Sequence, residues 1–377
     1  MKITHIALER LRLPLDPPFQ AAWEPEPWQG FETTLVRVHT DEGITGVATA
    51  GDTLDGFDTH RQLFLGTDPL DIVAQVRTIE AIGLRGAAYW SLEAACWDII
   101  GQVTGQPVSV LFGNAAKRLP AYASTGELRS PADRAESASA LKERGFRAMK
   151  IRMDRTRLRE GIEAVRRTRE AVGDEFEIMV DLDQSWQVAG SVAGSGGGER
   201  TTDLVRTRKL VAELGELGVF WVENPLPYPD LPGYKRLRAD IPHVRIAAGG
   251  LHRSVPELLR SLELDALDVY QMDVVQAVGM LRARTLAELA LLKHRHYTPH
   301  TWSDGIALLA NLHVAAGIGG GPYFEFPYDP PTWTPRRRDF MLAEPLDIDP
   351  DGFLTVPQTP GLGIELDEDA VAGYRVD

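Results

Sequence analysis

Ionisable residues stand at the ends of six of the eight short apolar segments that recur between residues 121 and 326. They are Lys150, Arg152, Asp181, Asp183, Glu223, Asp273, His300 and Glu325. Charged groups usually lie at the surface, whereas parallel barrels collect their catalytic groups at the C-terminal ends of the strands. The pattern therefore predicts one active site assembled from several neighbouring strands.

A metal cation would suit the acids on two consecutive segments, Asp181 and Glu223. Carboxylates from adjacent strands can converge on one ion, and oxygen-only ligands favour a hard divalent cation such as Mg²⁺. Taken as isolated acids at strand ends, the same residues would serve equally well as helix-capping groups. The ordered series of strand-end residues favours the metal site.

The two basic residues of segment 148–152 differ in their chemistry. Arg152 stays protonated above about pH 12 and is no base at neutral pH, but it can clamp a carboxylate or stabilise an oxyanion. Lys150 would become a candidate base if the positive charge of Arg152 beside it lowered its pKa. His300 is the side chain best suited to move a proton near neutral pH, although a lone histidine is more often structural.

The segments that would position these residues are 121–125, 148–152, 177–183, 219–225, 244–250, 266–273, 297–302 and 323–326. Amphipathic helical stretches separate them at spacings of roughly 25–40 residues, which is typical of a closed parallel barrel. Their nearly continuous apolar character indicates burial on both faces. An open doubly wound sheet is the rival fold, but residues 124–127 lack the glycine-rich phosphate loop expected after its first strand.

The N-terminal part of the chain has a different rhythm. Residues 2–15, 33–40 and 44–49 have strand patterns and residues 69–113 have a helical one, so a small α+β unit is predicted there. Residues 16–31 are rich in proline and aromatic side chains, and we predict a loop rather than a regular element.

Residues 189–200 (AGSVAGSGGGER) are rich in glycine and serine and are predicted to be flexible. They follow the third barrel segment, on the face expected to carry the active site. A tolerated surface insertion and a mobile flap over the site are both consistent with this composition.

The composition narrows the class of protein. With 40 basic and 54 acidic residues the net charge is −14, so partners with phosphate backbones or anionic lipid surfaces are not expected. A single cysteine, Cys96, excludes an internal disulfide framework and fits a reducing compartment. There is no signal-peptide pattern and no apolar stretch of about 18 residues. We therefore expect a cytoplasmic protein without membrane or nucleic-acid partners.

Several motifs, in order along residues 2–377, resemble the mandelate racemase and muconate lactonizing enzyme branch of the enolase superfamily. The resemblance implies an α/β fold, a (β/α)7β TIM-type barrel with an N-terminal α+β capping domain. We expect the capping domain at 1–118, the barrel at 119–334, and a C-terminal segment, 335–377, that returns to the cap. The motifs are Asp41–Gly46, Ala94–Gly101, Lys150–Arg152, Val180–Ser185, Trp221–Pro225, Gln271–Asp273, Pro299–Trp302 and Tyr323–Phe326.

The resemblance also implies a reaction, Mg²⁺-dependent abstraction of the proton α to a carboxylate through an enediolate. Asp181 and Glu223 resemble the first two metal ligands of the family. Asp273 and His300 resemble its Asp–His dyad, in which the carboxylate orients the imidazole and raises its basicity. Two further residues match the site: Glu325 resembles the acid that hydrogen-bonds the substrate carboxylate, and Lys150 resembles the first lysine of a Lys-x-Lys motif.

Two positions depart from the family pattern. Gly250, or Leu251 in another register, stands where the fifth strand of the family normally supplies a third acidic metal ligand. Arg152 stands where the family has a base lysine. Asp183, where the family often has asparagine, is expected to restore one negative charge to the metal site. With only His300 clearly competent as a base, chemistry with a single base is favoured.

The activity favoured on these grounds is dehydration of an acid sugar, an aldonate or aldarate, with His300 removing the α-proton. An epimerase, racemase or cycloisomerase of a related carboxylate is the first alternative, and a binding protein with an incomplete metal site is the second. Trp23, Trp28 and Trp302 are expected to contact the small carboxylate substrate, and packing on the barrel rim explains Trp23 and Trp28 equally well. Members of the family are commonly dimers or octamers, so a homo-oligomer is expected.

Overall fold

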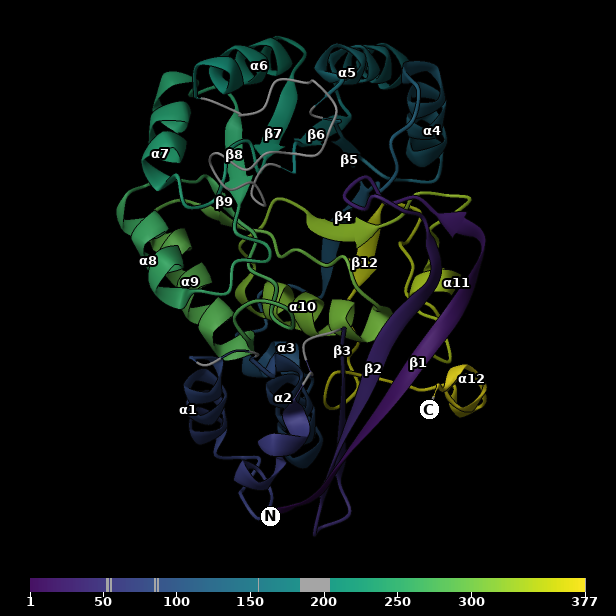
Figure 1. Ribbon diagram of the computed structural model, residues 1–377, viewed down its shortest axis with the longest axis vertical. Coiled ribbons are helices and arrows are strands. Elements are labelled where there is room, and N and C mark those ends of the chain that lie inside the picture. Colours follow the sequence, from purple (N-terminus) through teal and green to yellow (C-terminus); the bar gives the residue numbers. More distant parts are fainter. Residues whose placement is uncertain are drawn as a thin grey trace.

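The computed structural model describes residues 1–51, 54, 56–84, 86, 88–154, 156–183 and 204–376. The glycine-rich segment 189–200 lies outside these ranges, as does Ser185 of the motif that follows the third barrel segment. In the described part of the chain, an antiparallel N-terminal sheet lies along one side of a parallel sheet that is surrounded by helices (Figure 1). No helix among the described residues is long and apolar enough to cross a membrane.

The N-terminal sheet consists of β1 (Ile3–Phe19), β2 (Trp28–Thr40) and β3 (Thr45–Ala50), in that order. β1 and β2 pair as far as Phe19 and Trp28, so the prediction of an irregular loop over residues 16–31 is wrong at both of its ends. Phe19 is fully buried and contacts the rings of Trp28 and Trp333 at 5.6 and 5.1 Å. Burial of these aromatic rings outweighs the local preference of the prolines for a loop.

Helices α1 (Ile72–Gly83), α2 (Trp90–Thr104) and α3 (Val108–Leu111) follow, within the predicted helical range. α2 packs against β3 at Gly46, where a Cβ atom would lie 2.1 Å from the carbonyl oxygen of Ala95. This close approach requires glycine and allows Asp98 of α2 to accept a hydrogen bond from the backbone of Val47 at 3.0 Å. Cys96 is buried in this helix, as expected for a core residue.

Each of the eight predicted segments overlaps one strand of the barrel. These strands run parallel in one sheet in the order β10-β9-β8-β7-β6-β5-β4-β11. Side chains close the remaining gap, since Thr298 and Thr301 donate to the carbonyl oxygens of Tyr323 and Glu325 at 3.0 and 2.9 Å. The predicted fold class is confirmed. The strands are β4 (Arg118–Ser124), β5 (Ala148–Arg152), β6 (Glu177–Asp181), β7 (Val219–Glu223), β8 (Arg245–Ala248), β9 (Val269–Tyr270), β10 (His296–Tyr297) and β11 (Phe324–Pro327).

Helices connect these strands, and α4 to α9 lie around the outside of the sheet (Figure 1). Two of the helix starts are capped by serine: Ser130 accepts a hydrogen bond from the backbone of Asp133 at 3.2 Å and Ser254 from Glu257 at 3.4 Å. The helices are α4 (Pro131–Glu143), α5 (Leu158–Val172), α6 (Leu204–Glu216), α7 (Leu231–Asp240), α8 (Val255–Glu263), α9 (Met280–Leu292) and α10 (Gly305–Ile318).

The barrel interior has its own small core. Six fully buried side chains form it, and the rings of Tyr122 and Trp221 meet edge to face with centroids 5.3 Å apart. The six are Tyr122, Ala148, Met179, Trp221, Ala247 and Val269. This layer makes the interior a packed core, so the polar groups at the strand ends lie at its margin.

The C-terminal residues contain α11 (Pro335–Arg338), β12 (Phe353–Thr355) and α12 (Glu368–Tyr374). β12 pairs with β4 in antiparallel orientation, and Glu368 makes an ion pair with Arg37 of β2 at 2.7 Å. The chain thus returns to the N-terminal sheet after the barrel. The division into domains at residues 118 and 334 stays a prediction.

Candidate active site

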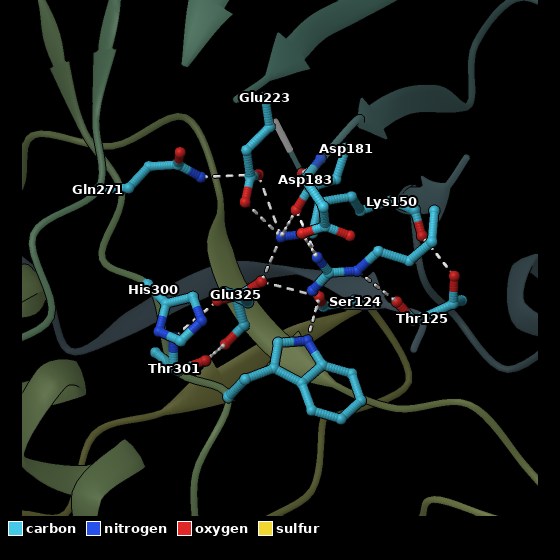
Figure 2. A network of polar contacts seen from close by, with 12 residues as sticks. Ser124, Thr125, Lys150, Asp181, Asp183, Glu223, Gln271, His300, Thr301 and Glu325 are labelled. Atoms are coloured by element: carbon cyan, nitrogen blue, oxygen red, sulfur yellow. Dashed lines mark hydrogen bonds and ion pairs between the residues drawn. The ribbon is translucent and has the colours of Figure 1, made fainter. Parts of the chain in front are cut away.

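The register of the parallel strands places the predicted site residues side by side at the C-terminal ends of the strands. Arg152 is paired with Asp181 across β5 and β6, and Asp181 with Glu223 across β6 and β7. Figure 2 shows the side chains of Asp181 and Glu223 pointing toward one another, with Lys150 among them and Glu325 and His300 on the opposite side. The parallel arrangement predicted from the sequence accounts for this convergence.

Lys150 lies at the centre of the cluster and its side chain is 0% exposed. Its Nζ donates to both carboxylate oxygens of Glu223 at 2.9 and 3.0 Å and to Glu325 at 2.6 Å. Burial alone would lower the pKa of Lys150, but Glu223 and Glu325 raise it above its usual value. The condition under which Lys150 would become a second base, a pKa lowered by Arg152, is therefore not met, because the carboxylates outweigh the neighbouring cation.

Arg152 links two acids with a single nitrogen. Its Nη1 donates to Asp181 at 2.6 Å and to Asp183 at 2.8 Å, and its Nε donates to the carbonyl oxygen of Thr125 at 3.3 Å. Burial opposes its charge, but Asp181 and Asp183 more than compensate and raise the pKa of the guanidinium. Arg152 thus stays positively charged and is not a base.

The cluster holds more negative than positive side chains. Four carboxylates, those of Asp181, Asp183, Glu223 and Glu325, surround the two cations. Burial, followed by the charge of Asp181, raises the pKa of Glu223 to about 8. Burial also acts on Glu325, but Lys150, His300 and hydrogen bonds lower its pKa to about 2. The buried excess of negative charge has to be met by a proton or by a further cation.

Asp273 and His300 form the expected pair. The Nδ1 atom of His300 lies 3.2 Å from Oδ2 of Asp273, whose side chain is fully buried. Oδ1 of Asp273 accepts hydrogen bonds from the backbone of Val275 and Gln276 at 2.8 and 3.0 Å and from the side chain of Asn311 at 3.2 Å. Asp273 is therefore held rigidly, and Nε2 is the ring nitrogen of His300 left to face a substrate.

A cavity of about 1770 Å³ opens above these residues and extends over β1 and β2. Its lining includes Arg152, Asp183 and His300, whereas Lys150 and Glu325 lie below it. The His300 side chain is 13% exposed, which gives a solute in the cavity access to the imidazole. The cavity and the His–Asp pair are therefore parts of one site.

Aromatic rings form one wall of the cavity. Trp23, Trp28 and Trp302, the expected substrate-contacting residues, all line it. The rings of Trp23 and Trp302 meet edge to face at 4.8 Å, and the guanidinium of Arg152 lies 4.6 Å from the ring centroid of Trp23. Contact between these rings and a substrate stays a prediction.

Neutral residues that the sequence analysis missed complete the network. Ser124 donates to Glu325 at 2.7 Å and accepts from the indole of Trp302 at 2.7 Å. Gln271 donates to Glu223 at 2.8 Å, and the backbone of Thr301 donates to Glu325 at 2.6 Å. Ser124 ends β4 and Gln271 directly follows β9, so their strand-end positions were a usable signal.

Position 250, which follows β8, the fifth strand of the barrel, is crowded. A Cβ atom at Gly250 would lie 2.9 Å from Cβ of His300, so the absence of a side chain there allows the imidazole its place. His252 lies two residues further on, where its ring stacks on Tyr228 at 3.7 Å and pairs with Glu257 at 2.5 Å. Neither residue supplies a third ligand to the acids of β6 and β7.

The donor set fits a divalent cation in type and charge. Asp181, Glu223 and Asp183 offer hard oxygen atoms, and the buried carboxylates outnumber the cations beside them. In the described part of the chain, however, no three Asp, Glu, His or Cys side chains lie close enough together to hold a metal ion. Lys150 and Arg152 occupy the oxygens instead.

Comparison with known families and proteins gives matches over most or all of the chain. A family model described as enolase C-terminal domain-like matches residues 133–370. D-galactarolactone cycloisomerase of Agrobacterium fabrum is 27% identical, with 100% of this chain and 99% of that protein covered. N-succinyl-L-Arg/Lys racemase of Bacillus cereus is 25% identical, covering 100% and 98%. Arabinonate dehydratase of Saccharolobus solfataricus is 27% identical, covering 78% and 73%.

Solved structures agree over the same length. A member of the enolase superfamily from Polaromonas sp. JS666 superposes with a TM-score of 0.86 at 26% identity, covering 100% of this chain and 98% of that chain. A racemase from Streptomyces coelicolor, solved with bound magnesium, has a TM-score of 0.83 at 24% identity and covers 99% and 100%. These likenesses extend over the N-terminal sheet as well as the barrel.

Proposed function

This chain belongs to the enolase C-terminal domain-like family of the enolase superfamily, and on that premise we propose that it is an enzyme that dehydrates a small hydroxylated carboxylate. The proton α to the carboxylate would be removed and the neighbouring hydroxyl group would leave as water. The observation that carries the proposal is the Asp273–His300 pair at the floor of the cavity. Dehydratases of acid sugars among its relatives, including arabinonate dehydratase, support the substrate class.

His300 does the proton transfer in this proposal. Asp273 orients the imidazole through Nδ1 and stabilises its protonated form, so Nε2 takes the α-proton. The same nitrogen then gives that proton to the departing hydroxyl group, which leaves as water. The product that remains is an enol, which becomes a 2-keto acid when carbon 3 takes up a proton from solvent and the enol hydroxyl group releases its own.

The metal part of the proposal assigns Mg²⁺ to Asp181 and Glu223, with Asp183 as a further oxygen ligand in place of the acid absent at Gly250. When bound, Mg²⁺ supplies positive charge beside the substrate carboxylate, where negative charge develops as the α-proton leaves. Asp183 is well placed for this role, since its backbone nitrogen donates to Asp181 at 2.9 Å and keeps the two acids together.

Single-base chemistry is favoured over racemisation. A racemase of the two-base type needs a base on each face of the α-carbon, and Lys150 is buried below the cavity in ion pairs that raise its pKa. Cycloisomerisation of a related lactone also needs only one base. It is the second candidate, supported by the full-length similarity to D-galactarolactone cycloisomerase.

The test is turnover of a panel of aldonates and aldarates in D₂O by the wild-type protein and by His300→Asn. We expect a 2-keto acid product from the wild type and a loss of about 10³-fold or more in kcat for the variant, because the imidazole that accepts the α-proton is removed. His252→Asn, which lies outside the pair with Asp273, is the matched control and should keep wild-type turnover.

Three outcomes decide between the alternatives. Undiminished turnover by His300→Asn would remove this residue from the mechanism. Formation of an isomer without loss of water would favour the cycloisomerase. A wild-type protein that neither converts any acid nor exchanges an α-hydrogen with D₂O, yet binds one of them, would point to the binding-protein alternative.

A further inference from the structure

Arg152 occupies the oxygen atoms that a metal ion would need. Oδ2 of Asp181 accepts from Arg152 at 2.6 Å, and Oδ1 of the same carboxylate accepts from the backbone of Asp183 at 2.9 Å. The other contact of the Arg152 Nη1 atom is Oδ1 of Asp183 at 2.8 Å. One guanidinium thus already bridges Asp181 and Asp183, the two acids that β6 and the residues after it offer to a cation.

We infer that Arg152 is an internal counter-cation that competes with a divalent metal ion for Asp181 and Asp183, so that the site exchanges its guanidinium for the metal. The inference rests on the metal part of the proposed function and goes beyond it. Two cations within one pair of carboxylate oxygens repel each other strongly at low dielectric. Arg152 therefore has to release Asp181 before that carboxylate can become a ligand.

The two basic residues of the cluster differ in their freedom to move. Lys150 is 0% exposed and is held by three carboxylate oxygens of Glu223 and Glu325. The side chain of Arg152 is 5% exposed and lines the cavity. Lys150 is therefore the more tightly enclosed of the two cations, and Arg152 is the one with space into which it can withdraw.

An aromatic surface is ready to receive the displaced guanidinium. The Arg152 guanidinium already lies 4.6 Å from the ring centroid of Trp23 and 5.9 Å from that of Trp302. The face of an indole ring attracts a guanidinium, which offsets part of the loss of its carboxylate partners. Once it has left Asp181, Arg152 presents its free N–H groups to the cavity, where a substrate carboxylate can accept two of them.

Backbone strain supports a site poised between two arrangements. Asp183 has a φ angle of +48°, in the left-handed region that side chains other than glycine seldom adopt. This conformation directs its amide toward Asp181 and its carboxylate toward Arg152. Strain of this kind is retained where the surroundings require a particular geometry, and it is common in ligand clamps.

The experiment is Mg²⁺ titration by calorimetry, with thermal unfolding in EDTA and in saturating Mg²⁺, on the full-length wild type, Arg152→Met and Arg152→Lys. We expect Arg152→Met to bind Mg²⁺ about tenfold more tightly, because no charged hydrogen bond has to be broken. Its melting temperature should fall in EDTA and recover in Mg²⁺ by more than that of the wild type. Arg152→Lys should lie between the two and carries the test if Arg152→Met does not fold.

The matched control is Arg157→Met. Arg157 is 56% exposed and makes ion pairs with Asp154 and Glu160 away from the cluster, so its loss should leave Mg²⁺ affinity unchanged. Equal or weaker binding by Arg152→Met would overturn the inference, as would absence of Mg²⁺ binding in every form. Neither result depends on turnover, so failure of the wild type to dehydrate any acid would overturn the proposed function alone.

Discussion

At the scale of single residues, the absence of a side chain at position 250 matters as much as the charges around it. Sequence comparison with the family alone suggests that Gly250→Glu would restore a ligand and tighten Mg²⁺. In the structure a Cβ atom there would lie 2.9 Å from Cβ of His300, so the new side chain must shift the imidazole away from Asp273. We predict that Gly250→Glu loses about tenfold or more in kcat, whatever it gains in metal affinity.

Comparison with Gly250→Ala separates the two effects in this experiment. Alanine adds the crowding Cβ atom without a carboxylate, so it should lower kcat to a similar degree and leave the Mg²⁺ dissociation constant unchanged. An increase in kcat for Gly250→Glu would show that His300 tolerates the added atom and that the lost acid was limiting.

The sequence could predict the ionisable residues of the site but not their partners. Asp181, Glu223 and Lys150 stand at strand ends, and parallel register was enough to bring them together. The partner of Asp273 on α10, Asn311, could not be predicted, because its role depends on how that helix packs against the strand ends. The catalytic and metal-binding roles themselves stay predictions.

At the scale of elements, Glu93 of α2 substitutes for a missing helix cap. α9 begins after Gly279, which has no side chain to cap it, and both carboxylate oxygens of Glu93 accept from its first backbone amides, those of Met280 and Leu281, at 3.1 and 2.8 Å. Burial raises the pKa of Glu93 to about 7, although these hydrogen bonds and that from Trp97 oppose the shift.

This arrangement predicts a pH dependence of stability. The folded-state pKa lies above the unfolded value of about 4.5, so the folded protein binds the extra proton, and its stability decreases as pH rises from about 4.5 to 7. Glu93→Gln does not titrate and should be less stable than the wild type at every pH. Its free energy of unfolding should change less between pH 5 and pH 8 than that of the wild type, by up to about 3 kcal/mol. Urea unfolding of both proteins at the two pH values measures this, and an equally steep difference in the variant would exclude Glu93 as its source.

Secondary structure followed from the sequence where burial is decided locally. The nearly continuous apolar runs around β5, β6 and β7 specify strands whatever lies next to them. The two ends of the predicted loop 16–31 were wrong because the partners of Phe19, including Trp333, lie far away in the sequence. A local pattern carries no information about such a partner.

At the scale of the whole molecule, one buried carboxylate joins the N-terminal sheet to the barrel. Asp304 caps α10 through the backbone of Ile306 and Ala307, both at 3.0 Å, and also accepts from Thr33 of β2 at 2.8 Å and Thr49 of β3 at 2.7 Å. It lies four residues after His300, so the same side chain holds the N-terminal sheet and the loop that carries His300.

Loss of the Asp304 carboxylate, which joins the N-terminal sheet to α10, should affect both stability and substrate binding. We predict that Asp304→Ala costs about 3 kcal/mol or more of the free energy of unfolding, because several buried donors lose their acceptor, and that it raises KM. Asp367→Ala removes only the exposed cap of α12, where the carboxylate accepts from Ala370 at 2.9 Å, and should cost about 1 kcal/mol. Urea unfolding and steady-state kinetics measure both, and equal losses in the two variants would contradict a role for Asp304 beyond capping.

The pairing of β11 with β4 also means that β4 is synthesised long before the strand with which it pairs. Ser124 and Glu325, which bond across this seam, are 201 residues apart. At ribosomal rates of about 5–20 residues per second, β4 waits roughly 10–40 s for the strand that completes it. During that interval the nascent chain has an open strand edge on which other chains can pair, and the polar cluster that depends on both ends of the barrel does not yet exist.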